Sequence, residues 1–549
     1  MSLRLPAAAL IAAIALAGAL VQPAHAAAPE PLATCFWEGP VSMKRPSSRG
    51  FDGHFFNYPE ESATYWLARF RMPEGAKLQL TGRFAHARYQ SLNAYSEGAP
   101  TDALSDLATG PDPGSVNPFI AGNRRDRARR SYTVTVVDEP PPTGARAPNT
   151  LYAQPQGDAA IELFYRVYEP DRGRDLDGGT GLPAPELVRA DGSTARDSAA
   201  CAQVNDPDRS IPTQTIPGPA WTGARNSPGC DGSTNPAFSP VRWERFFNID
   251  YSQRAVIQDC TPLGRSQRLS ETTPERGGFY SNRDNAYIFT HLSRKFGKVL
   301  TIQARLPTTP QTYAGQRRMG AGQVRFWSLC SGESRVTLRT PDCVSDRELP
   351  IDSGRRYTVV FSKAADRPSN ATEGCGVSWV DWGENGDGAG DPDYALLIMR
   401  NMLPQAGFAQ AIQRVPRPGM EQSTMGEYFP ATSYGSREDF QSRGCRASRV
   451  SLLGRRLRLD RRGRVRVRVR CTSVEERCKG RLGLRARGRL VARSRFTVRG
   501  GRSRVIGVRV GRSGRARLRR ARRLRVRARG TTPVGVRLSA SRVYRLRRH

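Results

Sequence analysis

The stretch QVRFWSLCSGESRVTLRTPDCVSDRELPIDSGRRYTVVFS (residues 323–362) decides the fold, because the chain contains a second, divergent copy of it. That copy reads ARYQSLNAYSEGAPTDALSDLATGPDPGS (residues 87–115) and continues into RSYTVTVVD (residues 130–138). Both copies contain R-aromatic-x-S-L, then S-D-x5-D-x-G, then a strand-like R-x-Y-T-V run. Self-similarity of this kind indicates a duplicated module.

The segments around both copies are typical of β-strands. ESATYWLARFRMPEGAKLQLTGRF (residues 61–84) matches DNAYIFTHLSRKFGKVLTIQARLP (residues 284–307), and IELFYRVYEP (residues 161–170) matches ALLIMRNMLP (residues 395–404). Alternation and enrichment in β-branched and aromatic residues favour strands over helices. The one short helical pattern is GFAQAIQRV (residues 407–415). We therefore predict an all-β chain with two duplicated β-sandwich, jelly-roll-like modules.

The N-terminus predicts export. Arg4 precedes fifteen apolar residues and then Ala-His-Ala, which is the order of a secretory signal, so we expect residues 1–26 to be removed. The apolar run is shorter than the roughly 20 residues that a spanning helix needs, and no later segment is long and apolar enough. The mature chain is therefore expected to be secreted or peripherally attached to the cell envelope, without a transmembrane segment.

Composition divides the remaining chain into four parts. The first β-module takes residues 27–205 and the second takes residues 241–445, joined by a connector at 206–240 that is rich in Pro, Gly and Ser. Such a composition predicts irregular structure. Residues 446–549 form the last part, which contains 38 of the 86 Lys and Arg residues but only 3 of the 50 acidic ones. Nearly all of the net charge of +36 therefore belongs to this part.

The basic part has its own strand pattern. RGRVRVRVRC, RSRVIGVRVG and LRVRARG alternate arginine with small or apolar residues, which turns one face of each strand to a core and the other to water. About seven such strands in roughly 100 residues predict an immunoglobulin-like basic β-sandwich. The part resembles the arginine-rich β-domains that end many exported proteins of high-GC actinobacteria.

The duplicated modules carry a second resemblance. F-W-S-L at residues 326–329, the Y-T-V-V strand and ALLIMRNMLP are similar to exported bacterial β-sandwich domains of unknown function that have an F-W-S-L-T-x-Y-D motif. Cys330, Gly332 and Glu333 depart from that motif. The resemblance implies a β-sandwich and brings no biochemical activity with it.

The ten cysteines form an even set in an exported chain, which predicts disulfides, and no C-x-x-C spacing suggests a zinc or redox site. We expect Cys330 to pair with Cys343 and Cys471 with Cys478, because each pair flanks a turn between strand-like runs. The sequence leaves the other six cysteines open.

Common catalytic signatures are missing: the chain has no G-x-S-x-G, H-E-x-x-H, G-x-x-x-x-G-K-[ST] or G-x-G-x-x-G. The duplicated S-D-x5-D-x-G is the first candidate ligand site, through Asp106 and Asp112 in one copy and Asp346 and Asp352 in the other. Carboxylates near a turn suit a hydroxyl-rich ligand or a hard cation. The alternative is that these residues only shape turns, where Asp and Gly are favoured for backbone reasons.

Two further loops are candidates. SWVDWGENGDGAGDPDY combines indoles with carboxylates, which suits sugar rings; its members are Trp379, Asp381, Trp382 and Glu384. The alternative places the two tryptophans in the core. PDRGRDLDGG resembles a calcium loop without its full ligand series, with Asp171, Asp175 and Asp177 as the candidate metal ligands. No cofactor is expected otherwise.

These features predict an exported, disulfide-stabilised binding or structural protein at the cell envelope, with a glycan or a protein as ligand of the duplicated modules. The basic part would act as an electrostatic anchor to anionic envelope polymers or head groups, and nucleic acid is not expected as the native partner. The alternative is a secreted polysaccharide hydrolase that uses paired carboxylates, which must stand about 5 to 9 Å apart.

Overall fold

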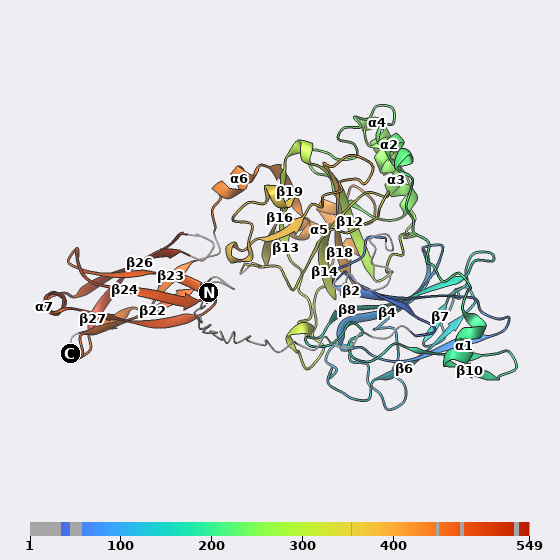
Figure 1. Ribbon diagram of the computed structural model, residues 1–549, viewed down its shortest axis with the longest axis horizontal. Helices are drawn as coiled ribbons and strands as arrows, with labels where there is room; N and C mark the ends of the chain where they lie inside the picture. Colours follow the sequence, from blue (N-terminus) through green and yellow to red (C-terminus); the bar gives the residue numbers. More distant parts are fainter. Residues whose placement is uncertain are drawn as a thin grey trace, which may run out of the picture.

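The computed structural model describes residues 34–43, 57–352, 354–445, 449–472, 477–531 and 537–547. The predicted signal peptide lies outside these residues. Strands dominate them and the helices are short, which confirms the all-β fold class. None of the helices in these ranges combines the length and the apolar character needed to cross a membrane. Figure 1 shows two β-sandwiches packed against each other and a C-terminal sandwich to one side.

The first module is a sandwich of two five-stranded sheets. We call the sheet that faces the second module the inner sheet and the other one the outer sheet. The inner sheet has the order β1 (Glu38–Val41), β2 (Ala63–Phe70), β8 (Ile161–Pro170), β4 (Ala87–Ser96), β5 (Ala99–Ser105). The outer sheet has the order β10 (Thr194–Arg196), β9 (Ala184–Val188), β3 (Lys77–Arg83), β6 (Ser131–Val137), β7 (Thr150–Tyr152).

The second module repeats the inner sheet strand by strand, whereas its outer sheet has, among the described residues, four strands and no counterpart of β10. Its inner sheet runs β11 (Glu244–Arg245), β12 (Asn285–Ser293), β18 (Tyr394–Met402), β14 (Phe326–Gly332), β15 (Cys343–Ser345). Its outer sheet runs β17 (Ser378–Asp381), β16 (Arg356–Ser362), β13 (Val299–Arg305), β19 (Ala431–Gly435). In both modules the last outer strand pairs in parallel with its neighbour, β7 with β6 and β17 with β16. The duplication is therefore a duplication of topology.

The burial of each strand follows from its layer. β4, β14 and β18 are buried along their whole length, whereas β3 alternates between buried and partly exposed residues. A sheet covered on both faces buries every residue, whereas a sheet with one solvated face buries every second one. The inner sheets thus lie between their own outer sheet and the opposite module, and the interface between the modules is part of the core.

The helices correct the sequence-based expectation of irregular or strand structure in several places. The structure has α1 (Asp197–Val204), α2 (Gly218–Arg225), α3 (Ile249–Gln258), α4 (Pro262–Ser270), α5 (Glu421–Met425) and α6 (Arg437–Ser442). The connector was predicted to be irregular, but it contains α2, which packs with α3 and α4 above the inner sheets (Figure 1). The expected helix at residues 407–415 is only a short 3-10 turn, Ile412–Arg414.

The basic part forms the predicted two-sheet sandwich. One sheet has the order β20 (Val450–Leu453), β22 (Arg464–Cys471), β25 (Ser503–Arg509), and the other β21 (Arg456–Arg458), β27 (Arg537–Arg547), β26 (Arg523–Thr531), β23 (Arg477–Ala486), β24 (Arg489–Arg499). The eight described strands divide into three and five, and β21 pairs with β27 in parallel, so the sandwich differs from the four-plus-three division of an immunoglobulin constant domain. A helix, α7 (Arg512–Arg519), connects β25 to β26.

All ten cysteines form disulfides, and the predicted pairs Cys330–Cys343 and Cys471–Cys478 are both confirmed. The three pairs that the sequence left open are Cys35–Cys201, Cys230–Cys260 and Cys375–Cys445. Cys230–Cys260 joins the connector to the turn between α3 and α4. Five disulfides fit a protein of an oxidising, extracytoplasmic compartment.

Candidate functional site

Two buried ion pairs join the modules, and each uses an arginine of one copy and an aspartate of the other. Arg88 donates from Nη1 to Oδ1 of Asp346 at 2.7 Å, and Arg325 donates from Nη1 to Oδ2 of Asp106 at 2.8 Å. Arg88 and Arg325 come from the duplicated R-aromatic-x-S-L, whereas Asp106 and Asp346 come from the duplicated S-D-x5-D-x-G. The two motifs of each copy are therefore completed by the opposite copy.

These pairs account for two of the predicted ligand residues. The Asp106 and Asp346 side chains are fully buried in the interface. Burial raises the pKa of Asp106 to about 7, against the opposing effect of Arg325. The second aspartate of each motif has separate partners: Oδ1 of Asp352 accepts from the backbone amides of Gly354 and Arg356 at a turn, and Asp112 bonds through its backbone to Ser131. The motif thus combines an interface residue with a turn residue.

Next to these ion pairs, each inner sheet has three residues that pair in register on neighbouring strands, and the three are equivalent in the two modules. In the first module Tyr65 of β2 and Ser91 of β4 both pair in register with Arg166 of β8. In the second module the three equivalent residues are Tyr287, Arg400 and Ser328. Each guanidinium lies over the ring of its tyrosine, at 5.7 Å from the ring centroid in the first module and 5.6 Å in the second.

Both arginines reach into the opposite module. Arg166 donates from Nη2 to the carbonyl of Tyr280 at 2.6 Å, and Arg400 donates from Nη2 to the carbonyl of Tyr58 at 3.0 Å. Tyr58 and Tyr280 both have a positive φ, 54° and 52°. A bulky residue rarely adopts this left-handed conformation unless its surroundings impose it. The reciprocal hydrogen bonds thus fix the segment before the first long strand in both copies.

The reciprocity fails at one position. The backbone amide of Glu60 donates to the hydroxyl of Tyr65, and the amide of Asn282 donates to the hydroxyl of Tyr287, so Glu60 and Asn282 are structural equivalents. The carboxylate of Glu60 pairs with Arg400 at 2.9 Å and accepts a hydrogen bond from Ser328. Asn282 brings no charge to the corresponding place. The first-module arginine thus lacks the direct ion pair that its equivalent has, although the charge of the buried Asp284 acts on it.

A cavity of about 1140 Å³, including its open mouth, lies at this junction. Both modules and the connector contribute to its wall. Its charged lining consists of three arginines, and no acidic residue lines it: Arg166, Arg335, Arg400. Ten of its lining residues are Phe, Tyr or Trp: Tyr58, Tyr65, Tyr168, Trp221, Phe246, Phe279, Tyr280, Tyr287, Phe289, Tyr394. A mostly apolar wall with a few polar groups is typical of a small-molecule site.

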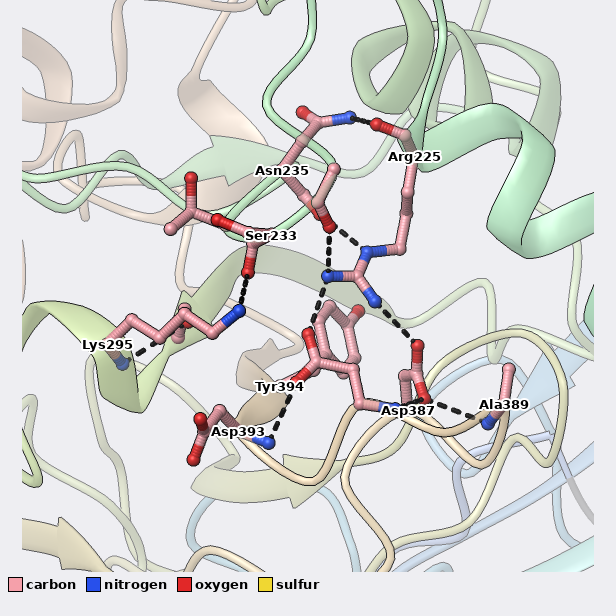
Figure 2. Close-up of polar contacts among 12 residues, drawn as sticks. Arg225, Ser233, Asn235, Lys295, Asp387, Ala389, Asp393 and Tyr394 are labelled. Carbon is pink, nitrogen blue, oxygen red and sulfur yellow. Dashed lines mark hydrogen bonds and ion pairs between the residues drawn. The ribbon is translucent and has the colours of Figure 1, made fainter.

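Helix α2 closes one side of the cavity and is held by the glycine-rich loop. Trp221 of α2 donates from Nε1 to Asp387 at 3.0 Å, and Arg225 pairs with the same carboxylate at 2.8 Å. Figure 2 shows Arg225 reaching from the helix to Asp387 on one side and to Asn235 of the connector on the other. The connector is therefore part of the site.

His291 lies in the wall beside Tyr394, whose ring also contacts Trp221 of α2. Its Nδ1 lies 2.8 Å from the hydroxyl of Tyr394, and Nε2 has no partner among the described residues. Burial, with Arg268 and Arg225 nearby, lowers the pKa of His291 to about 3, so the ring is neutral at pH 7. Burial also raises the pKa of Tyr394 well above its usual value, so both partners of this hydrogen bond are uncharged.

The predicted sugar site in the glycine-rich loop is dispersed. Trp382 is buried in the core of the second module, with its ring stacked on Phe361. Trp379 is half-buried and packs beside Arg367. Asp381 accepts from the amide of Gly383 in a turn, and Glu384 is 73% exposed beside Lys363. The two indoles thus have separate packing roles.

Two of the three candidate metal ligands have protein partners, whereas Oδ1 of Asp175 has none among the described residues. Asp171 pairs with Arg125, and Asp177 accepts from the loop amides of Gly179 and Gly181. Burial and the neighbouring Asp175 raise the pKa of Asp177 to about 6. In the part of the chain that the structure describes, the single metal-like cluster is Glu60 with Cys330 and Cys343, and that cysteine pair is a disulfide.

The basic module presents arginines on both of its sheets. β22 buries Val465, Val467 and Val469 and exposes the arginines between them, and β26 follows the same alternation. Among the described residues of this module Asp460 is the only acidic one, and it accepts from the backbone amide of Arg464. The exposed charge therefore has little compensation within the module.

The cavity residues were not singled out by the sequence, although a signal existed. IELFYRVYEP and ALLIMRNMLP each place one arginine inside a mostly apolar strand, and the alignment of the two copies equates Arg166 with Arg400. A charged residue retained in a buried strand needs a partner. The sequence alone does not show that the two inner sheets face each other.

No family model matches the chain, and no curated protein matches it. Among solved structures, an uncharacterised protein from Burkholderia cenocepacia is 11% identical and covers 68% of this chain and 79% of its own, with a TM-score of 0.34. A protein from Vibrio parahaemolyticus is 10% identical over 70% of this chain and 92% of its own, with a TM-score of 0.31. A glycosyl hydrolase family 2 member from Bacteroides cellulosilyticus is 6% identical over 48% of this chain and 29% of its own, with a TM-score of 0.16. Similarities this weak carry no argument about function.

Proposed function

We propose that this chain is an exported binding protein that holds a small ligand between its duplicated modules and is attached to the cell envelope by its basic module. The cavity at the junction carries this proposal, because equivalent residues of both copies build its polar wall. A cavity lined by aromatic rings with a few convergent polar groups is the usual form of a ligand site.

The basic module supports the second half of the proposal. Its arginines alternate along the strands and point to solvent, so they form charged surfaces on both sheets. A surface of this kind attracts polyanions through its electrostatic field, and guanidinium pairs with phosphate or carboxylate in a bidentate manner. In an extracytoplasmic compartment the available polyanions are envelope polymers and lipid head groups.

A polysaccharide hydrolase is less well supported. The carboxylates named for that role are engaged elsewhere: Asp346 is in a buried ion pair, and Asp352 and Asp381 accept from turn amides. The cavity wall itself contains no carboxylate.

The envelope attachment is tested with the mature chain, residues 27–549, and a shortened chain, residues 27–445, mixed with isolated bacterial envelopes. The salt concentration is raised from about 0.05 to about 1 M, over which the Debye length falls from more than 10 Å to about 3 Å. We expect the mature chain to sediment with envelopes at low salt and to be released as salt rises, and the shortened chain to stay in solution.

Two matched variants show whether envelope binding depends on the arginines of the basic module or on the total positive charge of the chain. Four Arg→Gln changes on β22 should lower the salt concentration of release: Arg464, Arg466, Arg468, Arg470. Four Arg→Gln changes at exposed positions of the first module should leave it unchanged: Arg127, Arg129, Arg172, Arg174. Equal retention of the mature and shortened chains at every salt concentration would contradict the anchor.

A further inference from the structure

The cavity has an excess of positive charge. Of its three arginines, Arg400 is neutralised by Glu60 at 2.9 Å. Arg166 and Arg335 form no ion pair among the described residues: Arg166 bonds to the hydroxyl of Tyr95 and a carbonyl, and Arg335 bonds to Gln253 and a carbonyl. A buried cation without a counter-ion is costly. The charges of Asp284 and Asp250 act on these two arginines without an ion pair, so a ligand could supply the direct partner that each of them lacks.

The two copies differ in the pairing of their equivalent arginines, Arg166 in the first module and Arg400 in the second. Glu60 and Asn282 occupy equivalent places, each with its amide bonded to the tyrosine hydroxyl five residues further on. One copy has a carboxylate there and the other a neutral amide. Arg400 thus forms a direct ion pair within the protein, while Arg166, which is only 2% exposed, does not.

Two further nitrogens of the wall lack a partner. These are Nε of Arg335 and Nε2 of His291, judged among the described residues. The Nε–H of Arg335 would complement an acceptor oxygen. The remaining wall combines a few neutral polar side chains with aromatic rings and aliphatic side chains, including Ile216, Leu396 and Ile398, and the rings favour a flat apolar body.

We propose that the cavity binds a small organic anion, with a carboxylate or phosphate group directed to Arg166 and Arg335 and a flat apolar body between the aromatic walls. This inference rests on the proposed binding function and names the ligand class. Hydrogen bonds from a guanidinium to an anion are stronger than those between neutral groups. A wall of aromatic rings strengthens them further, because it lowers the local dielectric constant.

The test uses the mature chain at about 0.5 M salt, where surface arginines are screened over a few ångströms. Three probes that share one ring system are titrated by calorimetry: 2-naphthoate, 2-naphthyl phosphate and the neutral 2-naphthylmethanol. We expect at least one of the two anions to bind about tenfold or more tightly than the neutral probe, as the loss of a charged hydrogen bond implies. The two anions show which anionic group the cavity prefers.

Asn282→Asp is the decisive variant, because it places a carboxylate where the other copy has one and removes no arginine. It should weaken binding of the anions about tenfold or more and leave the neutral probe unchanged. Arg335→Gln should act in the same direction. Arg367→Gln is the matched control, since Arg367 lies over the ring of Trp379 away from the cavity, and it should change nothing.

Equal binding of neutral and anionic probes, unaffected by Asn282→Asp, would overturn the anionic ligand class while leaving the cavity as a binding site. If none of the three probes binds to the mature chain, both the ligand class and the proposed use of the cavity are overturned. Envelope attachment is measured separately, so its failure is distinguishable from either result.

Discussion

His86 and His291 are held in environments that resist protonation. Burial comes first in both cases, and nearby arginines add to it, so that the pKa of His86 is lowered to about 4 and that of His291 to about 3. In the unfolded chain both titrate near 6.5. Between these values the unfolded chain binds protons that the folded chain does not, so folding is opposed as the pH falls.

We therefore predict that His291 lowers the free energy of unfolding as the pH falls from about 6.5 to about 3, while the raised pKa values of Asp106 and Asp177 act in the opposite direction. The contribution of His291 is isolated by urea unfolding of the unchanged chain and of His291→Gln across this pH range. The free energy of unfolding of His291→Gln, relative to the unchanged chain, should rise as the pH falls. A difference between the two chains that does not depend on pH would show that this histidine titrates alike in both states.

At the scale of single residues, the sequence identified the duplicated aspartates but not their purpose. Asp106 and Asp346 were weighed as ligands or turn residues because their neighbours along the chain are turn formers. Their actual partners, Arg325 and Arg88, lie more than 200 residues away. No local pattern contains that information. The duplication itself was the clue, since both copies keep the arginine and the aspartate together.

At the scale of elements, the strands were predictable and the helices were not. β-branched and aromatic alternation marks β3 and β6 directly, and the two copies support each other. The helices α3 and α4 are short and polar, although they begin at capping residues, Asn248 and Thr261. Such signals precede turns as often as helices in a Pro- and Gly-rich stretch. Packing against α2 and the inner sheet stabilises them in this fold.

The disulfides differ greatly in the length of chain that they close. Cys35–Cys201 spans 166 residues and Cys330–Cys343 spans 13. In the chain-entropy description, a longer loop removes more freedom from the unfolded state. Replacing both cysteines of Cys35–Cys201 by alanine should lower the free energy of unfolding by about 5 kcal/mol. The same replacement at Cys330–Cys343 should lower it by about 3 kcal/mol. Urea unfolding of the two double variants compares them; the reverse order would contradict the entropic explanation.

At the scale of the molecule, the modules form one core. Tyr89, Tyr168 and Phe326 belong to a buried cluster that spans both inner sheets, and the reciprocal ion pairs lie beside it. The sequence could establish two sandwiches and a basic third one, but not that the first two face each other. Uniform burial of β4, β8, β14 and β18 is the property that follows from this arrangement.

Arg88→Met should therefore lower the free energy of unfolding by about 3–5 kcal/mol, because it leaves Asp346 charged and buried. Arg88→Met combined with Asp346→Asn should lose less, since no buried charge is left alone. The control is Arg124→Met, which breaks an exposed pair with Asp126 and should cost less than about 1 kcal/mol. Equal effects of Arg88→Met and Arg124→Met in urea unfolding would contradict a structural role for the buried pairs.

The reciprocal ion pairs have the pattern expected of a symmetric dimer of single modules. A chain with a single module would carry both the arginine and the aspartate, and two copies of it would satisfy each other around a two-fold axis, as subunits of a symmetric dimer do. In such a dimer every residue appears twice, so a carboxylate beside one arginine would also stand beside the other. Two modules in one chain are free of that constraint. Glu60 and Asn282 can therefore differ, and one of the two equivalent arginines has a direct ion pair that the other lacks.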